Sequence, residues 1–572
     1  MNSGNDLVVI GLSGVQRFIA EAQSTADLAN ASDIASRLAA VAAHRFAPED
    51  LVLPASADPE GMPNRIVALT PAGTGQDLAR AAVRAVREEW DTWVGRLFGR
   101  AIEVPGFPEV FWSVAGPDVG NYARQWEDAH VALAARKRLR GFDAPEYAGR
   151  RPCALAPRWA AEPQPPRGVP RHERDAGLSA AGWVKRRWHA TPGLPAVRSS
   201  GFPSTSSIAS APYRAAVLDR LGEPEVRSAA KQLRAAVRAV AGDERFRAVE
   251  SPVPALRWDR ANTLAEWLAR GAGWWVYPTV WQEASLRREY ATDGHTFDDA
   301  HVERGRAAAR ALHESVGWAE PTPYYAVLAL DLDGMGAFLS RDPVDAGRHR
   351  AVSARLGDVA RAQRTVIEER SGVCVYAGGD DLLAFLPAAA ALDAVQACRD
   401  ALPGDGSLPS ASAAVLFVHS RSALRHAVNR TRSLLEAAKS VPGKNAVAVG
   451  FATGSGTAFH TVRPWSGDGY GNAVERLQMF LPADAAQGAG LSPRLVADLW
   501  RHRRGLAELA SASDSREVYR KEVTRLVLRH GGSRTDADTL VAFGFTEYAD
   551  SGSAPVPVDA ARVAVFLRGE SR

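Results

Sequence analysis

The order of strand and helix patterns between residues 324 and 451 limits the possible folds more than any other feature of this chain. Apolar segments of strand length alternate with helical patterns, and they lie at 324–331, 372–377, 382–387, 410–418 and 445–451. Helical patterns separate them everywhere except at the short link 378–381. The order strand-helix-strand-strand-helix-strand-helix-strand extends the split βαβ arrangement of ferredoxin-like folds. The sequence therefore predicts an α+β domain here.

A second α+β pattern occupies the start of the chain. It contains strand patterns at 7–12, 65–70 and 109–116, one long helical pattern over 15–46, and another helix at 75–98. We predict four domains: 1–118, an irregular and mostly helical middle region at 119–320, the α+β domain at 321–460, and a helical domain at 461–572. Pro and Gly clusters mark the middle region.

Length and composition are those of an ordinary globular protein. A chain of 572 residues exceeds one core, and no apolar run is long enough to span a membrane. The N-terminus lacks the basic start and apolar run of a signal peptide. The three cysteines, Cys153, Cys374 and Cys398, are far apart, which excludes a disulfide framework or a cysteine-rich zinc ribbon and favours a cytoplasmic location.

Basic residues are concentrated in the middle region, in a chain whose net charge is only +4. Runs of them occur at 135–140, 149–151 and 184–189. The simplest interpretation is a set of solvated faces. Contact with nucleic acid is the more specific alternative.

The short link in the α+β domain is unusual because it places two acids together. Residues 375–387 read VYAGGDDLLAFLP, with Gly378, Gly379, Asp380 and Asp381 between two strand patterns. Gly and Asp are common in hairpin turns for steric reasons alone. Adjacent carboxylates nevertheless repel one another, and burial increases the cost of keeping both ionised.

An internal repeat favours a function for the acids over a purely structural role. The segment GLSGVQRFIA at 11–20 resembles DLDGMGAFLS at 331–340, and each follows a strand and begins a helix. Gly11 and Ser13 stand where the second copy has Asp331 and Asp333. Chance similarity between two strand-to-helix junctions is the alternative. If the repeat is real, this junction folds without its acids.

We expect the acids to converge at one edge of the second α+β domain. Asp331 and Asp333 end a strand and point to one face, and the turn with Asp380 and Asp381 approaches the end of that strand. Such a cluster suits two Mg²⁺ or Mn²⁺ ions, which activate an attacking hydroxyl and neutralise a leaving pyrophosphate. Gly378 and Gly379 allow the backbone to approach a phosphate.

Two lysines follow the acids at the end of the same domain. Lys439 lies near a helix C-terminus and Lys444 in the next turn, where each is a candidate contact for a triphosphate. Lysines also favour helix ends because of the helix dipole, so a purely structural role stays open.

These segments together resemble a known family. The series DLDG, YAGGDD and AK…GKN resembles the palm domain of nucleotide cyclases and some polymerases. YAGGDDLLAFLP, GLSGVQRFIAEAQSTADL and MPNRIVAL resemble the large polymerase–cyclase subunit of type III CRISPR effector complexes. WVKRRW and FPSTSSIA resemble motifs of its type III-B (Cmr) branch.

The resemblance implies two palm domains that face one another with ATP between them. It implies synthesis of cyclic oligoadenylate messengers from ATP, switched on by target RNA, within a complex that holds other effector subunits and a guide RNA. Asp331, Asp380 and Asp381 are then metal ligands and catalytic acids. Gly378, Gly379, Asp333, Lys439, Lys444 and Ser13 are expected at the nucleotide, although Ser13 is equally a helix cap.

Two departures from the family pattern carry expectations of their own. The chain contains no His-Asp dipeptide, so we expect it to lack the HD nuclease that many members carry. Only Cys153 lies between the two palms, so we expect no four-cysteine zinc site.

Two other functions remain open at this stage. The chain is alternatively a catalytically silent scaffold or RNA-binding subunit, which pyrophosphate release from ATP would exclude. A diguanylate cyclase is less favoured, and turnover of GTP against ATP would distinguish it.

Overall fold

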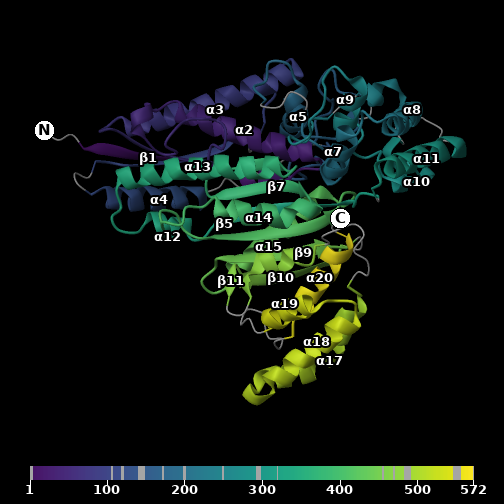
Figure 1. Ribbon diagram of the computed structural model, residues 1–572. Helices are drawn as coiled ribbons and strands as arrows, with labels where there is room; N and C mark the ends of the chain where they lie inside the picture. The colour runs from purple at the N-terminus through teal and green to yellow at the C-terminus, as the bar shows by residue number, and fades with distance from the viewer. Residues whose placement is uncertain are drawn as a thin grey trace.

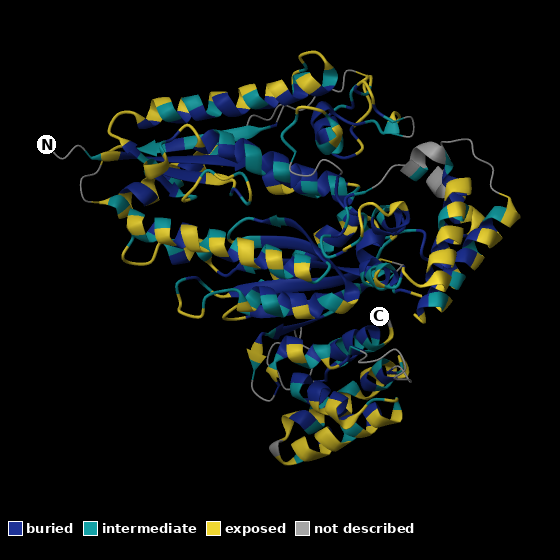
Figure 2. Cartoon of the chain, turned by 45° about the horizontal axis from the view of Figure 1, so that its top comes forward, coloured by how far each residue is buried: buried dark blue, intermediate teal, exposed yellow. Residues whose placement is uncertain are grey.

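The structure is a computed structural model, and its described part has two sheet-containing units with helical regions beside them (Figure 1). It describes residues 4–570 except 105–106, 118–120, 139–148, 171–172, 197–200, 248–249, 291–297, 319, 454–455, 468–469, 482–490 and 545–555. The two sheets are buried and the outer helices expose one side (Figure 2). No helix within these described residues combines the length and apolar character needed to cross a membrane.

The first unit is built around a four-stranded sheet in the order β2-β3-β1-β4. The central strand β1 (Asn5–Ser13) pairs antiparallel with β3 (Arg65–Pro71) and β4 (Glu109–Ala115), and β2 (Leu51–Leu53) forms an edge. Alternate side chains of β1 serve the two faces. Val8, Ile10 and Leu12 pack under α2 (Thr25–Ala43) and α3 (Gly75–Phe98), whereas Leu7 and Val9 pack on α4 (Tyr122–Arg138).

The second unit holds a six-stranded sheet, which confirms the predicted α+β class. Its order is β10-β9-β8-β5-β7-β6, and only β8 and β9 pair in parallel. The strands are β5 (Tyr324–Leu332), β6 (Val373–Ala377), β7 (Asp381–Pro387), β8 (Ala411–His419), β9 (Ala446–Ala452) and β10 (Ala458–Pro464). The edge strand β10 was not predicted, and the proposed domain limit at residue 460 falls inside it.

Helices cover both faces of this second sheet. α13 (Ala346–Glu369) and α14 (Ala391–Asp400) pack on the face that carries Leu328 and Leu330. α15 (Leu424–Lys439) packs on the opposite face, in one continuous core with α2 and α3 of the first unit. The two units therefore share a hydrophobic core.

The repeat read in the sequence corresponds to a repeat in space. β1 and β5 each lie between two antiparallel neighbours, and each is followed within two residues by a glycine in the left-handed region, Gly14 (φ 72°) and Gly334 (φ 67°). A short helix follows each glycine, α1 (Val15–Ala20) and α12 (Met335–Leu339). Even single bonds are repeated, since Leu12 N donates to Asn64 O and Leu332 N donates to Asp380 O, at 2.9 and 2.8 Å.

The helix predicted over 15–46 is in fact two helices. α1 ends at Ala20 and α2 begins at Thr25. Ser24 caps α2: its hydroxyl accepts a bond from Asp27 N at 3.1 Å, and the Asp27 carboxylate accepts one from Ser24 N at 3.2 Å. This capping box starts a new helix where helical periodicity alone predicts continuation.

The middle region is mostly helical, as expected, but one of its basic runs is not a surface. Lys185, on α5 (Ala180–Arg187), is 1% exposed and donates to the carbonyls of Phe18 and Glu21 at 2.6 and 2.7 Å. Arg186 forms an ion pair with Asp27 at 2.6 Å. The run at 184–189 therefore joins the middle region to the first unit, and both a solvated face and a nucleic-acid contact are wrong for Lys185.

The remaining helices complete the two helical regions. The middle region adds α6 (Thr205–Ala209), α7 (Ala211–Asp219), α8 (Pro224–Arg247), α9 (Thr263–Arg270), α10 (Glu283–Tyr290) and α11 (Asp299–Val316). Beyond β10 lie α16 (Ala473–Gln478), α17 (Arg494–Ser511), α18 (Arg516–Arg529), α19 (Arg534–Gly544) and α20 (Val558–Glu570). The basic run at 135–140 ends in Leu139 and Arg140, which fall outside the described residues.

Candidate active site

Two aspartates face one another on neighbouring strands of the second unit. Asp331 on β5 is the direct antiparallel partner of Asp381, the first residue of β7. Asp380 immediately precedes β7, and its carbonyl accepts the bond from Leu332 N at 2.8 Å. Antiparallel partners lie about 4.5–5.5 Å apart between Cα atoms, so the strand pairing itself brings these acids together.

The glycines of the turn are explained by this geometry. Gly379 has φ +101°, a conformation that other residues rarely adopt. A Cβ on Gly378 would lie 2.9 Å from Oδ1 of Asp381. One glycine thus permits the turn, and the other leaves room for the carboxylate.

The environment of the three acids raises the pKa of each. Burial raises the pKa of Asp381 to about 7, with further contributions from the charges of Asp380 and Asp331. Burial and the charge of Asp331 raise the pKa of Asp380. For Asp331, burial outweighs the opposing effect of Lys439, whose Nζ lies 2.7 Å from Oδ1 of this aspartate. Burial is the largest cause of each raised pKa, and the nearby cations Lys439, Arg65 and Arg432 do not offset it.

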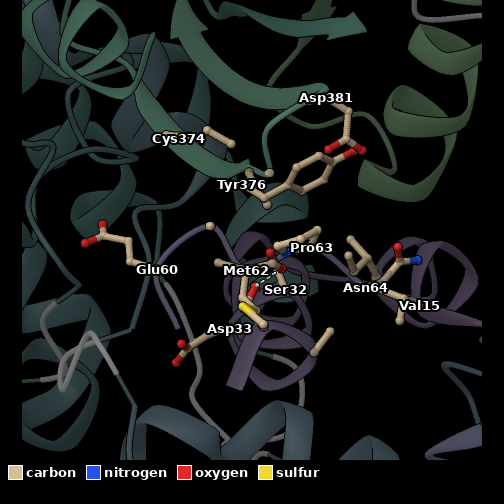
Figure 3. Close-up of a pocket in the computed structure, with 18 of the residues that line it drawn as sticks. Val15, Ser32, Asp33, Glu60, Met62, Pro63, Asn64, Cys374, Tyr376 and Asp381 are labelled. Carbon is tan, nitrogen blue, oxygen red and sulfur yellow. Dashed lines mark hydrogen bonds between the residues drawn. The ribbon is translucent and has the colours of Figure 1, made fainter. Parts of the chain in front are cut away.

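The acids open into a cavity of about 360 Å³ between the two units. Figure 3 shows Asp381 and Tyr376 projecting from the second unit, with Pro63, Asn64 and Val15 of the first unit opposite. The cavity continues past Ser32 and Asp33 of α2, and its volume lies in the range of ligand pockets. Its walls are formed by β6, the following turn and part of α13 in the second unit, and by α1, α2 and the loop at 59–64 in the first.

The first unit also contacts the acids directly, through a residue that the sequence did not single out. Gln16 on α1 donates from Nε2 to Oδ2 of Asp381 at 3.2 Å. Its Oε1 accepts a bond from Arg432 on α15 at 2.7 Å. A comparison of 11–20 with 331–340 places Gln16 opposite Gly336, so only the first copy has a side chain at this position.

Asp333 has a different position from the one expected. It lies after the end of β5, is 8% exposed, and accepts bonds from the hydroxyls of Ser410 and Ser412 and from Asn445 N, at 2.8–2.9 Å. These bonds connect the end of β5 to the start of β8 and to the residue before β9. Its carboxylate is held by these three donors, while its charge also contributes to the raised pKa of Asp331. The predicted nucleotide role of Asp333 stays a prediction.

The remaining predicted nucleotide residues lie at varying distances from the cavity. Gly378 lines it, and Lys439 reaches Asp331. Lys444 is exposed in the turn before β9, with φ 54°. Ser13 is 8% exposed at the end of β1, and the cavity wall nearby is formed by Val15 and Gln16 instead. The nucleotide roles of these residues stay predictions.

The first unit replaces the acids with neutral and basic residues. Gly11 on β1 pairs with Arg65 on β3, just as Asp331 on β5 pairs with Asp381 on β7. Asn64 corresponds to Asp380, because its carbonyl accepts the matching backbone bond from Leu12 N. Lys137 lies near the C-terminal end of α4, and its Nζ would be 3.0 Å from a Cβ on Gly11. An alignment of 61–65 with 377–381 would have identified Asn64 and Arg65 from the sequence.

The donor set of the second unit fits a divalent cation, although the side chains are not arranged around one. Carboxylate oxygens are the ligands that Mg²⁺ prefers, and three acids with raised pKa values need added positive charge. Across the described part of the chain, however, no three His, Cys, Asp or Glu side chains are grouped closely enough to hold a metal ion. Lys439 and Gln16 occupy one oxygen each of Asp331 and Asp381.

Comparisons with known proteins agree with this fold. The family profile Cas10/Cmr2, second palm domain, matches residues 324–448. CRISPR system Cmr subunit Cmr2 of Pyrococcus furiosus is 28% identical over 221 aligned residues, which cover 33% of this chain and 25% of that protein. The aligned part thus spans a quarter of that relative's length.

Similarity to solved structures extends over almost the whole chain. A type III-B Cmr-beta structure in the apo state has a TM-score of 0.63 and 12% identity, covering 99% of this chain and 81% of the other. A Cmr-beta structure bound to cognate target RNA has a TM-score of 0.60 and 12% identity, covering 99% and 82%. At this identity the likeness concerns the fold. Residues 324–448, from β5 into the start of β9, match the Cas10/Cmr2 second palm domain, and the aligned part of the chain is similar to Cmr2.

Proposed function

We propose that this chain synthesises cyclic oligoadenylates from ATP as the large subunit of a type III CRISPR effector complex, when target RNA is bound. The single observation that carries the proposal is the pairing of Asp331 with Asp381, beside Asp380, at a cavity between two units of like topology. The likeness to a Cmr-beta structure bound to cognate target RNA supports a role alongside guide and target RNA.

In this proposal Asp331, Asp380 and Asp381 hold Mg²⁺ or Mn²⁺ ions. Bound there, the ions lower the pKa of an attacking ribose hydroxyl and neutralise the departing pyrophosphate. Lys439, already at Asp331, is placed to turn toward phosphate once Asp331 binds metal. The cavity orients two nucleotides, and the first unit contributes neutral and basic groups to the half that lacks acids.

The proposal is tested with the assembled complex, ATP, Mg²⁺, guide RNA and target RNA. We expect pyrophosphate release and cyclic oligoadenylate products from the wild type. The double variant Asp380→Asn Asp381→Asn is expected to lose synthesis by several orders of magnitude while it still assembles, because two metal ligands are lost but no packing is. Full activity in this variant contradicts the site. Products from GTP alone, or none from the wild type, contradict the function.

A further inference from the structure

The contact from Gln16 to Asp381 crosses between the two units. Its members are 365 residues apart in the chain. Gln16 stands on the first turn of α1, directly after Gly14 and Val15, so the left-handed turn at Gly14 fixes its direction. An acid of one unit is thus held by an amide of the other.

Gln16 is itself held in one orientation. Arg432 Nη2 donates to its Oε1 at 2.7 Å, and Arg432 Nη1 donates to its backbone carbonyl at 3.5 Å. Because a guanidinium only donates, it fixes the amide oxygen toward Arg432 and the amide nitrogen toward the carboxylate. Arg432 and Lys439 lie seven residues apart on α15 and so serve the two facing acids from one side of that helix.

The contact leaves the chemistry of Asp381 compatible with a metal ligand. Gln16 bonds only Oδ2, while Oδ1 lies toward Gly378, where the missing Cβ leaves space. Hydrogen bonds from outside the ligand shell orient carboxylate ligands, and their loss weakens metal binding. At the matching position the second unit has Gly336, which carries no side chain and cannot make the corresponding contact.

We propose that Gln16, fixed by Arg432, is a positioning residue through which the first unit orients Asp381 for the metal ion. The inference rests on the proposed metal site and goes beyond it. It gives the unit that lacks the facing acids a role at the acidic site. It also makes metal affinity depend on how the two units meet.

The test is a titration of the full chain with Mn²⁺ in the absence of nucleotide, with free Mn²⁺ followed by electron paramagnetic resonance. We expect Gln16→Met to weaken Mn²⁺ binding about tenfold, the lower end of effects seen for groups just outside a ligand shell. Gln23→Met is the matched control, an exposed glutamine of the same unit away from the cavity, and it should bind as the wild type does. Because Gln16 is exposed, the melting temperature of the Gln16→Met variant in EDTA should equal that of the wild type.

Arg432→Gln tests how Gln16 is held. We expect a smaller loss than for Gln16→Met, and the double variant should be no weaker than Gln16→Met alone, as for two residues that act in series. Wild-type affinity in Gln16→Met overturns the inference. If the fold-losses of Mn²⁺ affinity in the two single variants multiply in the double variant, the role given to Arg432 is overturned. A wild type that binds Mn²⁺ no better than Asp380→Asn Asp381→Asn overturns the metal site and, with it, the proposed function.

Discussion

At the scale of single residues, the site combines facing acids with too little compensating charge. Asp331 and Asp381 face one another because strand register requires it, and Lys439 reaches only the first of them. Folding alone does not favour this arrangement, since burial raises the pKa of all three acids. Under the proposed function, bound cations would supply the missing positive charge.

This imbalance predicts a pH dependence of stability without metal. The pKa of Asp381 rises from 3.8 to about 7 on folding, so the folded state holds this proton more tightly. Its contribution to the free energy of unfolding is full below pH 4 and is lost as the pH rises through 7. In EDTA, the melting temperature of Asp380→Asn Asp381→Asn relative to that of the wild type should increase from pH 5 to pH 8. A difference that stays constant over this range contradicts the assignment.

At the scale of elements, two features hold the walls of the cavity: the turn between β6 and β7, and the contacts of the middle region with α1 and α2. The turn between β6 and β7 carries the acids and depends on Gly379 at φ +101°. On the other wall, Lys185 holds the C-terminal end of α1 through two carbonyls, and Trp188 Nε1 donates to Asp33 at 2.7 Å. The middle region thus supports the elements of the first unit that line the cavity.

The turn is tested by Gly379→Ala. We expect a loss of roughly 1–3 kcal/mol in the free energy of unfolding, because alanine is strained at this φ. The control Gly357→Ala lies inside α13, where a Cβ meets only Arg361 at 3.5 Å, and it should stabilise by about 0.5–1 kcal/mol. Urea unfolding measures both variants. Equal effects would show that the backbone conformation of the turn is not the constraint.

The contact between Lys185 and the end of α1 is tested by Lys185→Met. Loss of the ammonium leaves the carbonyls of Phe18 and Glu21 without this donor in a buried place, at a cost of roughly 1–3 kcal/mol. Lys231→Met on the exposed side of α8 is the matched control and should stay within about 0.5 kcal/mol of the wild type. Thermal melting compares the two. A neutral Lys185→Met would mean that water replaces the ammonium.

At the scale of the whole molecule, the two units touch both at the cavity wall and on the side away from it. A Cβ on Gly61 would lie 2.7 Å from the Ala377 carbonyl, so the loop between β2 and β3 contacts the end of β6 at the cavity wall. On the far side, the Tyr122 hydroxyl and the ring of His349 bond at 2.9 Å, and His349 Nε2 lies 2.8 Å from Leu339 O. These bonds therefore link the position of α4 beside the first sheet to the C-terminal end of α12 in the second unit. The proposed domain limits at 118, 320 and 460 stay predictions.

The whole molecule also carries a prediction about DNA. Because the chain contains no His-Asp dipeptide, we expect it to leave single-stranded DNA intact in a complex with target RNA and Mn²⁺ or Mg²⁺. The measurement is a nuclease assay on labelled DNA, with RNA-dependent ATP turnover as the control for activity. DNA cleavage that disappears with a substitution in this chain would reveal a nuclease site of another kind.

The sequence by itself determined the order of the strands β5 to β9 and of the helices between them, the repeated strand-to-helix junction, and the acids at Asp331, Asp380 and Asp381. These features depend on periodicity, turn residues and neighbours close in the chain, which local patterns record. The sequence did not show the edge strand β10 or the break between α1 and α2. Only the tertiary structure decided that Gln16 reaches Asp381, that Asp333 turns toward Ser410 and Ser412, and that Lys185 is buried. These outcomes follow from segments up to 365 residues apart that pack into one core, and no local pattern specifies such a pairing.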